Sequence, residues 1–266
     1  MATVAAIQNN ASGSLQDNLQ AIAVHVQQAS AQGAELILLP EHCLGQPKQI
    51  LDLTEPFGDG PGQTAMANMA RRFGVWLVVG AMPIRMPHDG HVYSTSLVYD
   101  DRGECVAHYN KMHLCHVTLD TSLQVQESDR FRGGDQVVAI DTPVGRVGLS
   151  ICYDVRFPEL YRQLSRDQVS IFLVPAAFLA YTGQYHWQVL LRARAIENTC
   201  YVVAANQYGL LPNGHAMYGH TQIIDPWGEV MGCLEDGDGA VIAHLQDTHL
   251  SNVRDRLPAL NHRRLQ

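Results

Sequence analysis

The stretch R-V-G-L-S-I-C-Y-D-V-R-F-P-E-L, from Arg146 to Leu160, sets a cysteine between two regular elements. The alternating apolar residues of 146–151 predict a short buried strand, and Pro158 opens a segment with helical spacing. At such a junction, free backbone N–H groups and the helix dipole lower the pKa of a thiol and can hold a developing oxyanion. We therefore interpret Cys152 as a candidate nucleophile. A second interpretation, equally open on this stretch alone, is a cysteine buried as a small hydrophobic residue.

Strands and helices alternate along the rest of the chain. Apolar runs with period two predict strands, and apolar residues spaced three and four apart predict helices. We expect strands at 3–8, 35–39, 75–81, 92–99, 104–109, 137–140 and 146–151, helices at 15–31 and 61–73, and an irregular segment at 112–134.

The two halves of the chain share three similar segments in the same order. They are E-L-I-L-L-P ending at Pro40 and S-I-F-L-V-P ending at Pro175, V-W-L-V-V-G-A from Val75 and C-Y-V-V-A-A-N from Cys200, and S-L-V-Y-D-D-R-G-E ending at Glu104 and T-Q-I-I-D-P-W-G-E ending at Glu229. Two similar halves, each a sheet with helices on one side, bury their sheets best against each other. The repeat therefore predicts an α/β fold, a four-layer α-β-β-α sandwich, and we expect residues 1–266 to form one domain.

Composition and charge narrow the class of protein. With 266 residues, of which 46% are hydrophobic, the chain can bury a sizeable core. Its net charge of −8, without a cluster of lysine or arginine, argues against nucleic acid or an anionic membrane as a partner. The start M-A-T-V-A-A-I-Q lacks a basic segment, no apolar run reaches membrane-spanning length, and the six cysteines form no C-x-x-C pair. We expect a cytoplasmic enzyme with reduced thiols and no membrane contact.

Two ionisable residues that follow predicted strands complete a possible amide-cleaving set. Glu41 comes after the strand at 35–39, and Lys111 follows the strand at 104–109. A carboxylate beside a thiol can take its proton, and an ammonium nearby favours the thiolate and stabilises negative charge on a carbonyl oxygen. Taken singly, a glutamate or a lysine is most often a solvated surface charge.

Three motifs, in order, make the chain resemble the nitrilase superfamily of carbon–nitrogen hydrolases. They are L-L-P-E-H at Glu41, Y-N-K-M-H-L at Lys111 and G-L-S-I-C-Y-D-V-R-F-P-E at Cys152. The resemblance covers essentially the whole chain and implies the same four-layer sandwich. It also implies that Cys152 is the nucleophile, Glu41 the general base and later acid, and Lys111 the group that stabilises the tetrahedral intermediate together with the Tyr153 N–H. Glu127 matches a further family glutamate, which is expected to orient Lys111 or to pass protons.

Within that superfamily, the sequence is more similar to one branch than to the others. The segment F-L-A-Y-T-G-Q-Y-H-W, residues 178–187, is similar to the deaminated glutathione amidase branch. In that branch the arginine four residues after the nucleophile, a phenylalanine and a threonine line the acyl pocket. The resemblance therefore implies substrate contacts for Arg156, Phe178 and Thr182.

The role of Arg156 has two interpretations. A guanidinium suits a substrate carboxylate because it offers paired donors. A structural ion pair with Asp154 or Glu159 is equally open. In addition, L-D-T-S-L-Q-V at residues 119–125 departs from the pattern of the branch in the loop near the pocket entrance.

We expect hydrolysis of a small carboxylate-bearing amide, above all deaminated glutathione, through a cysteine acyl-thioester. The alternatives are ω-amidase action on dicarboxylic acid monoamides, a Cys-His-Glu hydrolase with a histidine base, and a catalytically silent binding protein of the same fold. The chain has no nucleotide-binding glycine motif, and the H-L-C-H run at 113–116 lacks a second pair of zinc ligands, so we expect no cofactor and no metal. The resemblance also implies a homodimer or a larger homo-oligomer.

Overall fold

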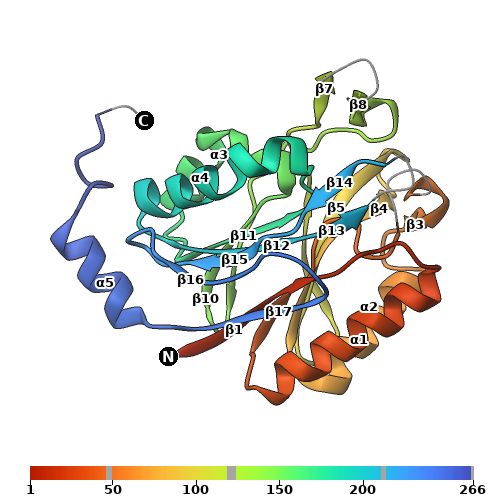
Figure 1. Cartoon of the computed structure of the whole chain (residues 1–266), viewed down its shortest axis with the longest axis horizontal. Helices are drawn as coiled ribbons and strands as arrows, with labels where there is room; N and C mark the ends of the chain where they lie inside the picture. The colour runs from red at the N-terminus through yellow and green to blue at the C-terminus, as the bar shows by residue number, and fades with distance from the viewer. Residues whose placement is uncertain (46–49, 119–123, 211–213, 265–266) are drawn as a thin grey trace.

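Two β-sheets lie face to face in the computed structural model, which describes residues 1–45, 50–118, 124–210 and 214–264 (Figure 1). The first sheet has the strand order β17-β1-β2-β4-β5-β6, with β3 paired to β4. Its strands are β1 (Ala2–Gln8), β2 (Leu36–Leu38), β3 (Glu55–Pro56), β4 (Trp76–Arg85), β5 (Val92–Tyr99), β6 (Cys105–Asn110) and β17 (Gly239–Leu245).

The second sheet has the strand order β16-β15-β12-β11-β10-β9. Its strands are β9 (Ala139–Thr142), β10 (Gly145–Leu149), β11 (Ile171–Ala176), β12 (Tyr201–Asn206), β15 (Thr221–Ile224) and β16 (Val230–Leu234). Two short hairpins lie outside both sheets, and they are formed by β7 (His116–Thr118) with β8 (Gln124–Gln126) and by β13 (Tyr208–Leu210) with β14 (Ala216–Tyr218).

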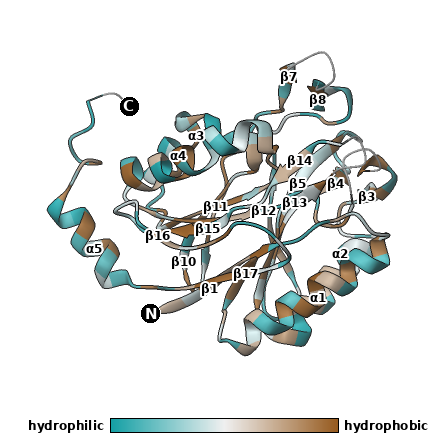
Figure 2. Ribbon diagram, in the orientation of Figure 1, coloured by the Kyte–Doolittle hydropathy of each residue, from teal (hydrophilic) through white to brown (hydrophobic). Residues whose placement is uncertain are grey.

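Helices cover the outer face of each sheet and produce the four layers. Along β1, Val4 and Ala6 enter the core shared with the second sheet, whereas Ala5 and Ile7 enter the core beneath α1 and α2. The strands are largely apolar and the helices carry hydrophilic bands between apolar ones (Figure 2). The helices are α1 (Leu15–Ala31), α2 (Pro61–Phe73), α3 (Pro158–Arg166), α4 (Ala180–Asn198) and α5 (Asp247–Arg256), and the 3-10 turns are η1 (Ile50–Leu53), η2 (Glu127–Asp129) and η3 (Cys152–Arg156).

The expected α-β-β-α sandwich and its internal repeat are confirmed. In the first sheet β1, β2 and β4 are parallel neighbours, followed by the antiparallel β5 and β6. In the second sheet β10, β11 and β12 are parallel neighbours, followed by the antiparallel β15 and β16. The two repeats differ in the strand that precedes their parallel strands in the sheet order. In the first sheet this strand is β17, which comes from near the C-terminal end of the described chain and pairs with β1.

The bounds of the two predicted helices are confirmed, and local capping explains them. The side chain of Ser14 accepts a hydrogen bond from the backbone of Asp17, which closes a capping box at the start of α1. Pro61 occupies the first turn of α2, and Gly74 ends it in the left-handed conformation with φ +63°. No helix among the described residues has the length and apolar character needed to cross a membrane.

Two predictions about irregular and extended segments are wrong in detail. The segment 112–134 contains β7 and β8, whose three-residue strands are too short to leave a periodic pattern. The strand expected to reach Ile151 ends at Leu149, because the Ile151 N–H donates to the Asp154 side chain and not to a neighbouring strand. Of the loop 119–125 that departs from the family pattern, residues 119–123 lie outside the described residues.

Candidate active site

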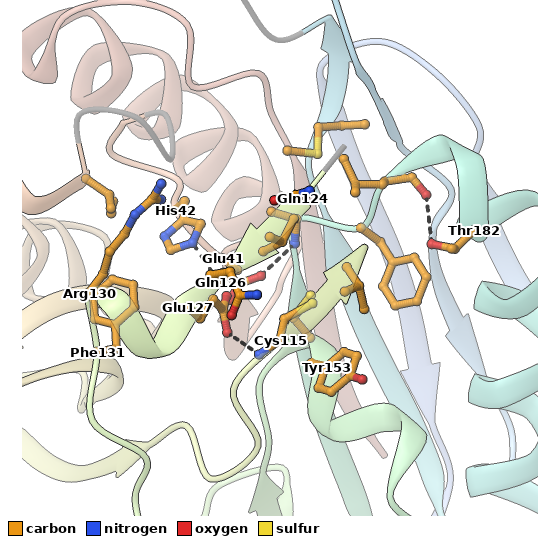
Figure 3. A pocket seen from close by; sticks show the side chains of 18 of the residues that line it. Glu41, His42, Cys115, Gln124, Gln126, Glu127, Arg130, Phe131, Tyr153 and Thr182 are labelled. Atoms are coloured by element: carbon orange, nitrogen blue, oxygen red, sulfur yellow. Dashed lines mark hydrogen bonds and ion pairs between the residues drawn. The ribbon is translucent and has the colours of Figure 1, made fainter. Parts of the chain in front are cut away.

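The carboxyl ends of strands from both sheets meet at one cavity of about 260 Å³. Glu41 follows β2, Lys111 follows β6, Cys152 follows β10 and Ala177 follows β11. Parallel strands end at the same edge of a sheet, so two facing sheets bring four chain segments together here. Figure 3 shows the side chains of both halves converging on this cavity.

Glu41 is a buried carboxylate with fixed partners. Its Oε1 lies 2.8 Å from Lys111 Nζ, and its Oε2 accepts a hydrogen bond of 3.0 Å from the Ala177 N–H. Burial alone would raise the pKa of the Glu41 carboxyl, but the Lys111 ammonium, helped by His42, outweighs burial and lowers the pKa to about 2. Glu41 is therefore ionised across the physiological range.

Lys111 is 1% exposed and bonds two carboxylates. Its Nζ lies 2.8 Å from Glu41 Oε1 and 2.9 Å from Glu127 Oε1, and its backbone N–H donates to the Ser94 carbonyl at 2.9 Å. Burial opposes the charge, but Glu127 and Glu41 together raise the pKa of Lys111 well above its usual value. The ammonium is thus fixed both in position and in protonation.

Glu127 is the second carboxylate that bonds this ammonium. It begins the 3-10 turn η2, and its second oxygen, Oε2, accepts a hydrogen bond of 2.8 Å from the Cys115 N–H. Because each oxygen has its own donor, the carboxylate is fixed against rotation. The structure therefore brings Glu127 together with Glu41 and Lys111, as the family resemblance implies.

Cys152 stands at a sharp turn directly after its strand. Its backbone φ is +48°, in the left-handed region that residues other than glycine rarely adopt. Such a turn lifts a side chain out of the sheet, as in the nucleophile elbows of other hydrolases. Burial and the hydrogen-bonded Glu41 carboxylate raise the pKa of the Cys152 thiol well above its usual value, and Lys111 opposes them only in part.

The predicted helix-dipole effect on this thiol is therefore wrong. Cys152 opens the 3-10 turn η3, and the first α-helix, α3, begins only at Pro158. The cysteine is a neutral thiol beside an ionised carboxylate, so a nucleophilic role for Cys152 requires a base that takes its proton.

A fully buried carboxylate joins the lysine segment to the cysteine segment. Asp154 accepts hydrogen bonds from the Tyr109 hydroxyl at 2.8 Å and from the Ile151 N–H at 2.9 Å. It also accepts from the backbone N–H of His113 at 3.0 Å and from the His113 ring at 2.7 Å. Tyr109 and His113 flank Lys111 on either side, and Ile151 directly precedes the cysteine. Asp154 thereby sets the distance between the two segments, a role that the sequence analysis missed.

Arg156 lies against aromatic rings in the cavity wall. Its guanidinium carbon is 5.0 Å from the centre of the Phe178 ring and 5.5 Å from that of Tyr153. Its Nη1 lies 3.2 Å from Nδ1 of His186 on α4. Among the residues that the structure describes, no carboxylate lies at ion-pair distance from this guanidinium, so the ion-pair interpretation is wrong.

The remaining residues expected at the acyl pocket also line the cavity. Phe178 is 4% exposed, and its N–H donates to the Asn206 side chain at 2.9 Å. Thr182 lies in the first turn of α4 with its hydroxyl 3.4 Å from the Leu179 carbonyl oxygen, and Tyr153 of η3 lines the same cavity (Figure 3). The structure therefore brings the site residues expected from the sequence to one cavity, except that Lys111 does not line it and instead bonds Glu41 and Glu127, which do.

Several cavity residues were not anticipated from the sequence. His42 directly follows Glu41 and could have been found from that position, whereas Cys115 and Arg130 lie in the segment expected to be irregular. Met217 comes from β14, which reaches the cavity through the small β13-β14 hairpin. The places of these residues in the cavity depend on how the segments between the strands fold over the sheet ends.

The carboxylates of this site surround an ammonium. Within the described chain, the ligand atoms of Glu41, His42 and Glu127 lie within 4.8 Å of one another, a spacing that a metal ion could use. However, the Lys111 ammonium bonds both carboxylates, so the group is already built around a cation. The H-L-C-H run is likewise engaged, since the His113 ring bonds Asp154 and does not point to a shared site.

Comparisons with known proteins agree with this geometry. A family model described as carbon-nitrogen hydrolase matches residues 3–255. The deaminated glutathione amidase of Yersinia enterocolitica is 38% identical over 99% of this chain and 93% of its own, and that of Synechocystis sp. is 40% identical over 97% of each. The crystal structure of the C. elegans NitFhit protein matches with a TM-score of 0.91 and 34% identity, over 99% of this chain and 66% of that one. With its three motifs meeting in one cavity and this extent of similarity, the chain belongs to the carbon–nitrogen hydrolase family.

Proposed function

We propose that this protein is an amidase that hydrolyses deaminated glutathione through a cysteine acyl-thioester. The observation that carries the proposal is the position of Lys111 Nζ, 2.8 Å from Glu41 and 2.9 Å from Glu127, two carboxylates that line the same cavity as Cys152. The curated relatives named deaminated glutathione amidase support this substrate. The products are the α-keto acid of the acyl part and the peptide cysteinylglycine.

In the acylation step Glu41 acts as the general base. The thiol proton passes to the Glu41 carboxylate as Cys152 Sγ bonds to the amide carbon, and the carbonyl electron pair moves to oxygen. Lys111 and the Tyr153 N–H stabilise that oxyanion. The C–N bond then breaks, and Glu41 returns the proton to the departing amine.

In the deacylation step a water molecule replaces the amine. Glu41 takes a proton from the water as its oxygen bonds to the thioester carbon, and the C–S bond breaks when the second oxyanion collapses. The cysteine recovers the proton from Glu41, which leaves a free carboxylic acid. Glu127 acts as a positioning residue, because it bonds Lys111 at 2.9 Å and helps to hold the ammonium in place.

The acyl part of the substrate carries an α-keto carboxylate, which a buried pocket must neutralise. Arg156 supports this assignment because its guanidinium lines the cavity and stacks on Phe178 without an acidic partner among the described residues. Its Nε is buried and makes no hydrogen bond within the described structure. A substrate carboxylate supplies the acceptor that this donor needs.

Turnover and trapping measurements on Cys152→Ala test the mechanism. The variant should lose turnover and keep the fold and substrate binding, because alanine removes only the sulfur nucleophile. Mass spectrometry of the wild-type protein during turnover should find the acyl group on Cys152. Cys115→Ala is the matched control, since this second thiol lines the same cavity and has no part in the chemistry. Full activity in Cys152→Ala, or an acyl group on another cysteine, contradicts the proposal.

A substrate panel separates the proposed activity from its alternatives. Wild-type kcat/KM should be highest for deaminated glutathione, lower for short dicarboxylic acid monoamides, and lowest for N-carbamoyl compounds and nitriles. A higher value for the monoamides makes the protein an ω-amidase. Absence of turnover on every member leaves the fold without this activity and supports a binding protein.

We also propose that the chain forms a homodimer or a larger homo-oligomer. Tyr181, Tyr185 and Val189 recur every four residues on α4 and are 56%, 70% and 66% exposed. An apolar stripe of this kind favours association with a second copy. Sedimentation of the wild type and of Tyr185→Glu tests the proposal, since a charge in the stripe should dissociate the assembly.

We propose a cytoplasmic location for the protein. All six cysteines are free thiols, and Cys105 and Cys233 are exposed. Exposed free thiols are typical of a reducing compartment. Fractionation of cells that produce the protein should find it with cytoplasmic markers.

A further inference from the structure

The Arg156 guanidinium has one polar partner among the residues that the structure describes. Its Nη1 lies 3.2 Å from Nδ1 of His186 on α4. An arginine side chain has N–H donors and no acceptor, so the histidine nitrogen has to accept this hydrogen bond. The His186 ring in this contact is therefore neutral, with its proton on Nε2.

Two aromatic rings hold the guanidinium in place without choosing which of its edges faces the cavity. The guanidinium carbon lies 5.0 Å from the centre of the Phe178 ring and 5.5 Å from that of Tyr153. A ring face attracts the positive charge as a whole, so this attraction fixes the distance from the ring more firmly than the rotation of the planar group above it. A hydrogen bond has a preferred direction. The contact with His186 is therefore the one that fixes this rotation.

The same contact leaves one pair of donors without an acceptor. With Nη1 engaged by His186, Nε and Nη2 remain as a pair on one edge of the guanidinium. Within the described structure, Nε of Arg156 is buried and makes no hydrogen bond. A paired edge of this kind can bind both oxygens of a carboxylate. Arg156 lines the cavity and His186 does not, so the histidine holds the guanidinium without occupying the substrate space.

Helix α4 fixes the position of His186. Thr182 lies in the first turn of α4 and lines the cavity, and His186 follows four residues later on the same face of the helix. The next residue, Trp187, is fully buried, and its Nε1 donates to the His220 carbonyl at 2.9 Å. The centre of its ring lies 5.0 Å from that of Phe178. Core packing therefore ties this turn of α4 to the ring on which the guanidinium lies.

We propose that His186 is a positioning residue that directs the Nε–Nη2 edge of Arg156 toward the carboxylate on the acyl part of the substrate. The inference rests on the proposed function, in which Arg156 receives that carboxylate. Because His186 does not line the cavity, it acts on the substrate only through Arg156. Its loss should weaken binding of acyl groups that carry a carboxylate and should leave the chemistry at Cys152 unchanged.

The experiment compares three substrates in four forms of the full-length protein. The substrates are deaminated glutathione, the primary amide of the same acyl part, and an analogue of deaminated glutathione in which a methyl group replaces the acyl carboxylate. The first two share the carboxylate and differ in the leaving group. The protein forms are the wild type, His186→Leu, His186→Asn and the matched control Gln188→Leu. Gln188 is exposed on the same helix and does not line the cavity.

His186→Leu should raise KM for both carboxylate-bearing substrates by about 5-fold, as expected for loss of one solvated hydrogen bond to a charged group. Their kcat, and both constants for the methyl analogue, should change by less than about 2-fold, because only the contact with the carboxylate is disturbed. His186→Asn should keep KM near the wild-type value, since the asparagine side-chain oxygen can replace Nδ1 as the acceptor. Gln188→Leu should match the wild type.

A double-mutant cycle tests whether His186 acts through Arg156. In the Arg156→Met background, His186→Leu should change KM for deaminated glutathione by less than about 1.5-fold, because the group that it positions is already absent. Losses that multiply in the double variant mean that His186 acts independently of Arg156.

Three results overturn the inference and leave the proposed function intact. They are equal losses on all three substrates, an unchanged KM in His186→Leu, and losses that multiply in the double variant. If the wild type hydrolyses the methyl analogue as well as deaminated glutathione, no carboxylate is bound at Arg156. The proposed function then loses its acyl assignment, and the inference fails with it.

Discussion

The Tyr109 hydroxyl donates a hydrogen bond of 2.8 Å to Asp154, a carboxylate with no exposed surface. Tyr109 lies in β6 of the first sheet, two residues before Lys111. Asp154 lies two residues after Cys152 in the 3-10 turn η3, which follows β10 of the second sheet. The contact therefore joins the Lys111 segment of the first sheet to the Cys152 segment of the second. We expect the relative position of the ammonium and the thiol to depend on it.

Replacement of Asp154 by asparagine should slow catalysis without a matching change in substrate binding. Asparagine replaces one carboxylate oxygen, a hydrogen-bond acceptor, by an NH₂ group, which is a donor. That donor faces the donor of Tyr109, Ile151 or His113, so this buried donor loses its acceptor, at a cost of about 1–3 kcal/mol in unfolding free energy. We expect kcat to fall by about 10-fold or more, because the ammonium and the thiol are no longer held at the right distance from each other. KM should be nearly unchanged. Tyr109→Phe removes one bond only and should show a smaller effect of the same kind.

Steady-state kinetics and urea unfolding of both variants provide the check. A loss of unfolding free energy with an unchanged kcat means that Asp154 acts on stability alone. Recovery of kcat in Asp154→Glu, with its carboxylate restored, supports the positioning role.

The variant Glu41→Gln should be almost inactive. Loss of a general base commonly reduces the rate by ~10²–10⁴-fold. The same change should lower the pKa of the Cys152 thiol, because the Glu41 carboxylate is one of the groups that raise it and Lys111 remains. Titration of the ultraviolet thiolate absorbance, with Cys152→Ala as the blank, measures this shift.

His42→Asn is the control that separates a glutamate base from a histidine base. His42 lines the cavity beside Glu41, so it is the histidine best placed to act as a base. We expect this variant to keep most of its kcat. A dead His42→Asn together with an active Glu41→Gln moves the protein to the Cys-His-Glu class.

The variant Lys111→Met should lose both activity and stability. Methionine fills the volume but leaves Glu41 and Glu127 without the ammonium that lies 2.8 and 2.9 Å from them. Breaking a buried ion pair in this way costs about 3–5 kcal/mol in unfolding free energy. Urea unfolding near pH 7 measures the loss, and a difference below about 1 kcal/mol, the value typical of exposed pairs, contradicts it.

The pH dependence of stability gives a second measure of the same pair. The pKa of Glu41 is lowered from 4.5 to about 2, so its ionisation stabilises the fold above pH 4.5 and this contribution disappears as pH falls toward 2. In Lys111→Met the ammonium that lowers this pKa is absent, so acid should relieve the repulsion of the two carboxylates. The stability difference between wild type and variant should therefore shrink between about pH 5 and pH 3. A difference that stays constant over this range contradicts the assigned pair.

Arg156→Lys should weaken catalysis on amides whose acyl part carries a carboxylate. An ammonium lacks the planar fork of a guanidinium, and it cannot stack on Phe178 in the same way. Arg156→Met should cost more, on the order of 2–5 kcal/mol, when the substrate carboxylate is left buried without a partner. Values of kcat/KM for deaminated glutathione, a short ω-amide acid and an uncharged amide of matched length test this prediction. Equal losses on all three assign Arg156 a structural role.

Sequence pattern alone was sufficient for the elements whose signals are local. The helices Leu15–Ala31 and Pro61–Phe73 follow from apolar spacing and from capping residues within one turn of each end. The three repeated segments predicted two facing sheets, because each half exposes an apolar sheet face that only the other half can cover. The motifs around Glu41, Lys111 and Cys152 predicted the chemical set, since each follows a predicted strand, although the strand before Cys152 ends two residues earlier than expected.

Only the tertiary structure decided how these residues act on one another. The hydrogen bond between Lys111 and Glu41 joins residues that are 70 positions apart in the chain. The last strand of the first sheet, β17, pairs with β1, which lies near the opposite end of the sequence. No local pattern encodes such pairings. Neither the contacts of Asp154 nor the lack of a carboxylate beside Arg156 among the described residues was therefore visible in advance. The thiol pKa of Cys152 rises because folding buries the sulfur beside a carboxylate, and burial and distance are properties of the packed molecule.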